Sequence, residues 1–292
     1  MTAASALHVG IIGLGKIGGN MAANLLKQGF QLSAYDIEAI RASAVSTMGG
    51  LRRDSVQALA RHADVIITSL PGPQQLEAVM FGDSGVLAHA RPGTVWLDTG
   101  TNSIETMTAI SARAGELGIE SIAAPVSGGV RAAETGTLSI FVGGNAETFA
   151  KIKSILEAVG EQIHYVGKFS NASILKLLIN YLCFVNTKAI GEVLTLGQEA
   201  GIDLNQFVTM AQSSAGNSWV MEKLVPAWLQ GGSAPGFTLN LAYKDACLIN
   251  ELNARFTAAP LESGERLCEL FDQARSFYGG EENFVSIVNV RQ

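Results

Sequence analysis

The chain is poor in charge, and none of its charge is gathered in one place. Only 16% of its 292 residues are charged, the net charge is −6, and 48% are hydrophobic. A chain of this composition buries a sizeable core, which excludes a disordered or low-complexity protein. An acidic chain without a Lys/Arg cluster is also a poor partner for nucleic acid or an anionic membrane. The length allows one large domain or two ordinary ones.

Cysteine is also scarce. The three cysteines, Cys183, Cys247 and Cys268, lie far apart, and no two of them have CxxC spacing. An odd, scattered set argues against a disulfide framework and against a zinc site. We therefore expect reduced cysteines, no bound metal and a cytoplasmic location.

Neither a targeting segment nor a membrane span is expected. Residues 1–7 are uncharged and precede a strand that begins at His8 or Val9, which leaves no room for a signal or transit peptide. The most apolar later stretch, 174–185, contains Lys176 and Asn180. It is too short and too polar at those positions to cross a bilayer.

Apolar runs alternate with amphipathic stretches through the first half of the chain. The expected strands are 8–13, 31–36, 64–70, 94–100, 119–126, 137–144 and 162–167, and the clearest helices are 20–28, 55–62 and 104–117. This alternation predicts an α/β fold with a doubly wound, mostly parallel sheet and helices on both faces.

The pattern becomes helical after residue 167. A long helix is expected over 171–200, ending before Gly201, because glycine commonly follows the last helical turn. Further helices are expected at 204–213, 219–230, 241–256 and 261–277. We predict two domains, 1–167 and an all-α domain at 168–292, joined by the long interdomain helix.

A glycine-rich turn follows the first strand and opens the first helix. It reads Gly13, Leu14, Gly15, Lys16, Ile17 and Gly18, a GxGxxG motif in the context that dinucleotide binding requires. Gly13 allows the tight turn, Gly15 lets the backbone approach a pyrophosphate, and Gly18 lets helix and strand pack closely. A purely structural turn is the plain alternative.

Asp36 ends the second strand, 23 residues after Gly13. A carboxylate at this place binds the ribose hydroxyls of NAD and repels the 2′-phosphate of NADP. Arg41 is the only nearby cation. Against the alternative of a solvated aspartate, the two signals together predict a Rossmann domain over 1–167 with NAD as cofactor and NADP less favoured.

Four segments in order resemble the β-hydroxyacid dehydrogenases, the group of 3-hydroxyisobutyrate dehydrogenase, over essentially the whole chain. They are GLGKIGGNMAANL (13–25), APVSGG with GTLSIFVGG (124–129 and 136–144), GKFSNASILKLLIN (167–180) and FTLNLAYKD (237–245). The resemblance implies an NAD-dependent enzyme that oxidises a small 3-hydroxy acid. Separately, an apolar all-helical second domain favours association, so we expect a homodimer or homotetramer.

The resemblance also implies roles for individual residues. Ser127 and the backbone of Gly128 and Gly129 would bind the substrate carboxylate, Lys176 would be the general acid/base, and Asn180 would position the substrate. The residues that would contact the cofactor beyond the glycine-rich turn are Leu70, Pro71, Thr101, Phe237 and Lys244. Trp219 either lines the substrate pocket or packs as an ordinary helix residue.

Lys176 and Asn180 are four residues apart and so share one helix face among leucines. A lysine in such a helix either has a function or extends its charge to the edge of an interface. Alcohol oxidation needs a base, and the ordinary lysine pKa of about 10.4 is too high. Burial and the positive nicotinamide ring are expected to lower the pKa of Lys176, so that the neutral amine takes the hydroxyl proton.

Other chemistries fit the sequence less well. The four histidines, His8, His62, His89 and His164, lie outside these motifs, which disfavours a histidine relay of the lactate dehydrogenase kind and a metal-dependent alcohol dehydrogenase. Ser127 lacks the context of a nucleophilic serine. The chain is short for a 6-phosphogluconate dehydrogenase, and a retained Lys176 disfavours imine reduction.

Five positions depart from the usual family pattern: Ala123, Ala132, Ser170, Ala172 and Gly100. None removes a catalytic group, but they leave the choice among 3-hydroxyisobutyrate-like, serine-like and threonate-like acids open. Reduction of a small semialdehyde acid is the reverse reaction and stays an alternative. A non-catalytic NAD(P)-binding scaffold is the alternative from another class.

Overall fold

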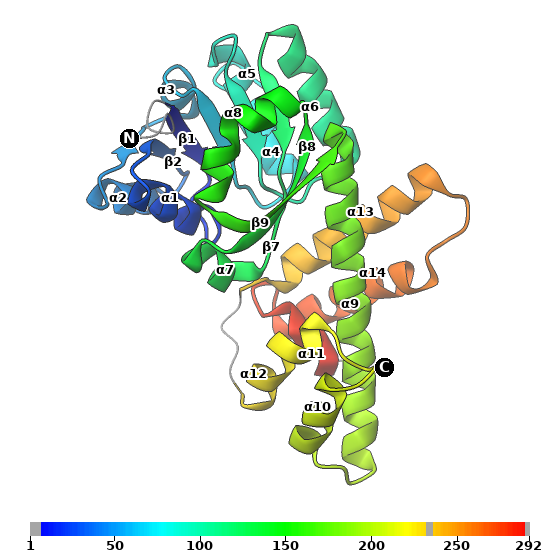
Figure 1. The fold of residues 1–292 in the computed structure, drawn as a ribbon. Helices are drawn as coiled ribbons and strands as arrows, with labels where there is room; N and C mark the ends of the chain where they lie inside the picture. The colour runs from blue at the N-terminus through cyan, green and yellow to red at the C-terminus, as the bar shows by residue number, and fades with distance from the viewer. Residues whose placement is uncertain (1–6, 232–235, 290–292) are drawn as a thin grey trace. The chain divides into compact units, whose positions relative to one another are not determined.

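The computed structural model of the chain describes residues 7–231 and 236–289, so the expectations for residues 1–6 lie outside the described part (Figure 1). The chain forms two compact units, with the boundary between Lys176 and Leu177.

The first unit is built on one twisted sheet. Its strands are β1 (His8–Ile12), β2 (Gln31–Tyr35), β3 (Leu51–Arg52), β4 (Val65–Thr68), β5 (Val95–Asp98), β6 (Glu120–Ala123), β7 (Val126–Ser127), β8 (Leu138–Gly144) and β9 (Gly160–Gly167). The order is β3-β2-β1-β4-β5-β6-β8-β7, with β9 beside β8. Strands β1 to β6 are parallel, and the first six positions have the strand order of a Rossmann fold, as predicted.

Helices cover both faces of this sheet (Figure 1). They are α1 (Gly18–Lys27), α2 (Ala39–Thr47), α3 (Val56–Ala60), α4 (Pro73–Met80), α5 (Val86–His89), α6 (Ile104–Glu116), α7 (Gly129–Thr135) and α8 (Ala146–Glu157). Val65 and Ile67 of β4 pack into the core layer that contains α1, and Ile66 packs into the opposite layer. Successive side chains point to opposite faces, so a strand buried on both sides is apolar throughout.

The expectation of a single strand over 119–126 is wrong. Pro125 separates β6 from β7, because proline offers no N–H to continue the ladder. The two short strands instead pair antiparallel with β8, with Val126 opposite Ile140. This break directs the chain after Ser127 into a new turn. The two-residue strand β3 was not predicted, because it is exposed and contains no apolar run.

The second unit is helical. Its elements are the greater part of α9 (Phe169–Glu199), then α10 (Leu204–Gln212), α11 (Trp219–Lys223), α12 (Val225–Leu229), α13 (Leu239–Phe256), α14 (Glu262–Tyr278) and a 3-10 helix (Phe284–Asn289). Helices α13 and α14 form a closely packed hairpin, and Phe184 of α9 packs edge-on against Phe271 of α14, with 4.9 Å between ring centroids. The single helix expected over 219–230 is wrong: it breaks at Leu224, because Pro226 lies in the first turn of α12.

Helix α9 is continuous over 31 residues. Within the described part of the chain it alone is long and apolar enough to span a membrane, which is weak support for a span because core helices of water-soluble proteins meet the same criterion. Its two polar motif residues, Lys176 and Asn180, are buried. The helix ends before Gly201, whose φ of +77° is the left-handed conformation expected after a last turn.

Candidate active site

The predicted cofactor residues of the first unit gather at one edge of the sheet. The glycine-rich turn follows β1, Asp36 follows β2, Leu70 and Pro71 follow β4, and Thr101 follows β5. Carboxyl ends of parallel strands share one edge, and the strand order reverses between β1 and β4. In open α/β sheets this reversal point opens the crevice in which a dinucleotide binds.

The three motif glycines are glycine for two different reasons. Gly13 has a φ of +91°, and a side chain there would overlap the carbonyl oxygen of Ser69. A side chain at Gly18 would overlap the carbonyl oxygen of Gly13. A Cβ at Gly15, by contrast, would meet no protein atom within 4 Å. Gly13 and Gly18 therefore hold the turn together, whereas Gly15 keeps open the space that a pyrophosphate needs beside the N-terminus of α1.

Two backbone N–H groups fix the orientation of the Asp36 carboxylate. Its Oδ2 accepts from the backbone N–H of Leu14 at 2.6 Å, and its Oδ1 accepts from the N–H of Glu38 at 2.8 Å. Each carboxylate oxygen has a further lone pair, which suits two ribose hydroxyls. Arg41 Nη1 lies 3.8 Å from Oδ2, and Arg41 also pairs with Glu38 at 2.9 Å. The open turn and this fixed carboxylate fit NAD.

A buried polar cluster supports the loop after β5, and sequence reasoning missed it. Thr68 Oγ1 donates to Asp98 Oδ1 at 2.7 Å, and Asn102 Nδ2 donates to Asp98 Oδ2 at 2.9 Å. A Cβ at Gly100 would lie 2.8 Å from Asn102 Nδ2. The departure at Gly100 therefore makes room for Asn102. No local signal could reveal this cluster, because Thr68 and Asp98 come from different strands.

The loop predicted to bind the substrate carboxylate follows β7. Gly128 has a φ of +117° and Gly129 a φ of +71°, and both values favour glycine strongly. A Cβ at Gly128 would lie 2.7 Å from Ala132, whereas one at Gly129 would meet nothing within 4 Å. Ser127 is half-buried directly before this turn. The backbone of Gly128 and Gly129 and the hydroxyl of Ser127 thus lie together without bulky side chains between them. This arrangement suits the predicted binding of a carboxylate.

The motif residues of the second unit are joined through a carboxylate to which the sequence assigned no role. Asn180 Nδ2 of α9 donates to Asp245 Oδ2 of α13 at 2.7 Å, and Lys244 Nζ lies 2.8 Å from Asp245 Oδ1. Asp245 is only 1% exposed, and Lys244 offsets the cost of burying its charge. Because its Nδ2 donates to Asp245, the side-chain amide of Asn180 has a fixed orientation. The partners are 65 positions apart, which is why the sequence did not reveal the pair.

Lys176 lies one turn before Asn180 on α9 and is 8% exposed, like Asn180 itself. Such burial is uncommon for lysine, whose charged form loses hydration when it leaves water. The two side chains lie on one face of the helix because they are four residues apart.

The structure also shows the surroundings of the other two predicted residues, Phe237 and Trp219. The ring of Phe237 lies in an aromatic cluster, 5.4 Å from the ring of Phe284 and 6.2 Å from that of Phe184. Trp219 begins α11 and is 50% exposed. Neither observation tests contact with cofactor or substrate, and both assignments stay predictions.

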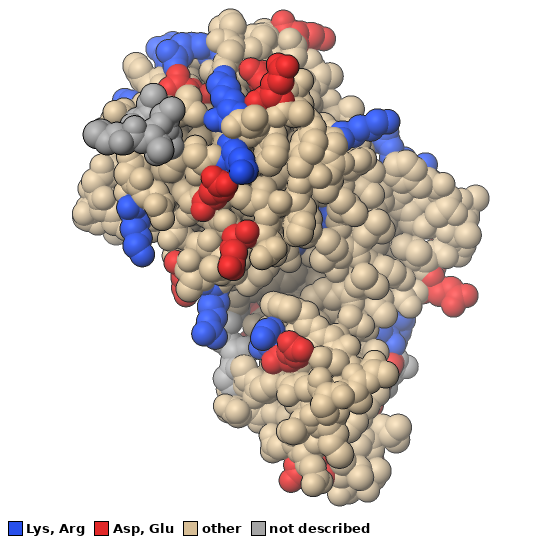
Figure 2. Space-filling view, in the orientation of Figure 1, with Lys and Arg blue, Asp and Glu red and all other residues tan. Residues whose placement is uncertain are grey.

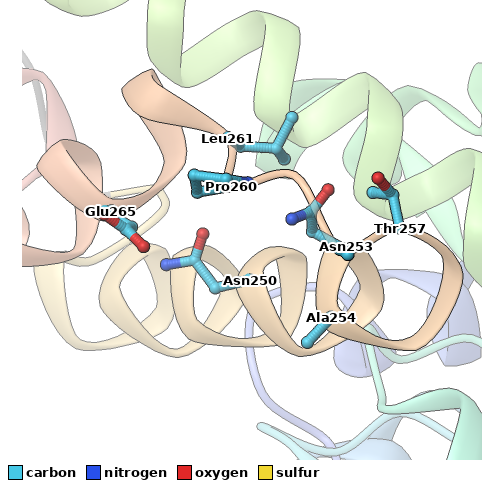
Figure 3. Close-up of a pocket in the computed structure, with 8 residues that line it drawn as sticks. Asn250, Asn253, Ala254, Thr257, Pro260, Leu261 and Glu265 are labelled. Atoms are coloured by element: carbon cyan, nitrogen blue, oxygen red, sulfur yellow. The ribbon is translucent and has the colours of Figure 1, made fainter.

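A hollow of about 490 Å³ lies beside the turn that joins α13 to α14 (Figure 3). It is lined by Asn250, Asn253, Ala254, Thr257, Ala258, Pro260, Leu261 and Glu265. Two of its amides already hold the turn, because Asn250 Nδ2 donates to Gly264 O and Asn253 Nδ2 to Ala259 O. None of its residues belongs to a motif, so we assign the hollow to the packing of the hairpin.

Comparison with known proteins gives a consistent family. Residues 8–167 match the family described as the NAD binding domain of 6-phosphogluconate dehydrogenase, and residues 170–291 match that described as the NAD-binding domain of NADP-dependent 3-hydroxyisobutyrate dehydrogenase.

Similar proteins cover nearly the whole chain. The 2-(hydroxymethyl)glutarate dehydrogenase of Eubacterium barkeri is 33% identical over 97% of this chain and 94% of its own. The 3-hydroxyisobutyrate dehydrogenase of Pseudomonas aeruginosa is 33% identical over 81% and 82%. A structure of Mycobacterium tuberculosis 3-hydroxyisobutyrate dehydrogenase with L-serine has a TM-score of 0.88 at 26% identity, covering 97% of this chain and 98% of that one.

Proposed function

Because the chain belongs to the β-hydroxyacid dehydrogenase family, we propose that it oxidises the 3-hydroxyl of a small 3-hydroxy acid with NAD. The acid is 3-hydroxyisobutyrate-like, serine-like or threonate-like. The observation that carries the proposal is Lys176, a buried amine one turn before an oriented Asn180 in a chain that also has an open dinucleotide turn.

Bound NAD supplies the acceptor for the hydride that leaves the hydroxyl-bearing carbon. In the proposed mechanism the substrate carboxylate binds to Ser127 and to the backbone of Gly128 and Gly129. Asn180 orients the substrate, and neutral Lys176 takes the hydroxyl proton as hydride leaves. In the reverse direction, protonated Lys176 returns that proton to the carbonyl oxygen of a semialdehyde acid.

The remaining cofactor assignments are part of the same proposal. Leu70 and Pro71 after β4 and Thr101 after β5 would cover the nicotinamide ribose, and the segment from Phe237 to Lys244 would add a second set of contacts. The position of the first three at the carboxyl edge of the sheet supports this. The buried Asp98 cluster, which holds the loop leading to Thr101, would fix that contact.

Replacing Asp36 should change the cofactor preference. Asp36→Ser removes the carboxylate that faces the ribose, and a hydrogen bond to a charged group contributes about 1.5–3 kcal/mol. We therefore expect the KM for NAD⁺ to rise roughly 10- to 100-fold and the preference over NADP⁺ to shrink or reverse. The measurement is kcat/KM with each cofactor. Asp54→Asn, which removes a charge from an exposed pair with Arg52, is the matched control and should keep the wild-type preference. An unchanged preference in Asp36→Ser would contradict the assignment.

The function itself is tested with a panel of 3-hydroxyisobutyrate, serine, phenylserine, threonate, glycerate and 3-hydroxypropionate, following NADH formation. We expect one acid to be oxidised clearly faster than the others. The corresponding semialdehydes are tested with NADH, because the favoured direction is open. Tight NAD binding without turnover of any compound in either direction would support the scaffold alternative instead.

We also propose that the enzyme works in the cytoplasm as a homodimer or homotetramer. Large apolar side chains of the second unit are exposed, among them Leu182, Leu196, Met210 and Phe277. Burial of such side chains between subunits is a common reason for their exposure in a single chain. On the face drawn in Figure 2, basic and acidic side chains are interspersed and form no broad basic area. A monomer in light scattering at micromolar concentration would contradict the assembly.

A further inference from the structure

We propose that Cys247 and Cys268 form a reversible disulfide that joins α13 to α14. The two Sγ atoms lie 2.9 Å apart, and both residues are free, half-buried thiols. A disulfide bond brings its sulfurs to about 2.05 Å, so closure needs a movement of less than about 1 Å. Helices α13 and α14 already pack closely along their hairpin, so the pair is held in reach by the fold.

The surroundings of the two sulfurs assign them different roles. Burial, and then a hydrogen bond with Cys247, raise the pKa of the Cys268 thiol to about 12, although a hydrogen bond from Asn250 acts in the opposite direction. Tyr243 forms a hydrogen bond with Cys247, which raises the pKa of the tyrosine hydroxyl, and the Arg275 guanidinium lies 3.8 Å from the centre of the Tyr243 ring. The raised pKa makes Cys268 the poorer attacking thiol, so Cys247 attacks the oxidant first.

The oxidant is a low-molecular-weight disulfide such as oxidised glutathione. The Cys247 thiolate attacks one sulfur of the oxidant, forming a mixed disulfide and releasing one thiolate. Cys268 then loses its proton to solvent and attacks the Cys247 sulfur, and the second small thiolate leaves. Two protein thiols are oxidised and one small disulfide is reduced to two thiols. The same steps in reverse, with excess reduced thiol, open the bond.

The bond would stabilise the helix that carries Lys244 and Asp245. Cys247 lies on α13, within one turn of Asp245, whose carboxylate holds Asn180. A cross-link between α13 and α14 lowers the entropy of the unfolded chain, so the oxidised protein should melt at a higher temperature than the reduced protein.

The full-length protein is equilibrated with oxidised and reduced glutathione, quenched in acid, alkylated and cleaved with trypsin without reductant. We expect Asp245–Arg255 linked to Leu267–Arg275 in the wild type and in Cys183→Ser, with the link lost after reduction. Cys247→Ser and Cys268→Ser should lack it, and their Tm should not rise on oxidation. If these variants do not fold, the tryptic peptides of the wild-type protein test the proposal by themselves. Full alkylation of all three cysteines, a bond to Cys183, or glutathione adducts without the link would overturn the proposal.

Discussion

Replacing Lys176 with alanine should remove nearly all turnover and leave NAD binding intact. Positioned general acid/base catalysis contributes roughly 10²- to 10⁴-fold, and we expect kcat to fall by that amount. Lys176 is buried one turn before Asn180, whereas Lys168, the other titratable residue of the segment 167–180 that resembles the catalytic one, is exposed. The measurements are kcat with the best substrate of the panel and a fluorescence titration with NADH.

Two further variants separate a proton-transfer role from other roles of a lysine. Lys176→Arg keeps the positive charge but cannot release a proton near neutral pH, so it should be nearly as inactive as the alanine variant. Lys188→Ala removes another lysine of α9, which pairs with Glu192, and should keep near-normal kcat. Comparable activity of Lys176→Ala and the wild type would eliminate the assignment of the base.

Replacing Gly15 with valine should block the cofactor without unfolding the protein. A Cβ at this position meets no protein atom within 4 Å, so the side chain would fill only the space assigned to the pyrophosphate. Overpacking costs about 1–3 kcal/mol, so the Kd for NADH should rise roughly 10- to 100-fold or more. Calorimetric titration gives the Kd, and thermal melting without ligand should show a Tm close to that of the wild type.

Gly18→Ala is the contrasting variant in the same motif. Its Cβ would overlap the Gly13 carbonyl and crowd the Ser69 side chain, so we expect a clear loss of Tm even without ligand. If Gly15→Val bound NADH normally, the open space beside Gly15 would not be the cofactor site. If both variants lowered Tm equally, the structural distinction between the two glycines would be wrong.

The fold and the family could be predicted from the sequence because their signals are local. Strands buried on both faces have continuous apolar runs, as in 65–67, and GxGxxG followed by Asp36 is the local signal of a dinucleotide site. The predictions failed at Pro125 and Pro226, where the apolar pattern continues but the regular element does not. Each proline lacks an N–H, so the predicted strand over 119–126 and the predicted helix over 219–230 are each divided in two.

The contacts that orient the candidate site could not be predicted, because their partners are distant in the sequence. Asp245 is part of a motif, but its bond to Asn180 depends on how α13 packs against α9. Cys247 and Cys268 look unrelated in the sequence and meet only because α13 and α14 form a hairpin. The assignments of Ser127 and Lys176 rest on the family resemblance and stay predictions until they are tested.

Hydride transfer from the hydroxyl-bearing carbon to NAD is the central claim, and isotope transfer tests it most directly. The acid of the panel that is oxidised fastest is prepared with deuterium on that carbon, incubated with unlabelled NAD⁺, and the reduced cofactor is analysed by mass spectrometry and NMR. We predict that the deuterium appears at C4 of the nicotinamide and that none exchanges into water. Unlabelled NADH, or deuterium lost to solvent while the acid is consumed, would contradict the account.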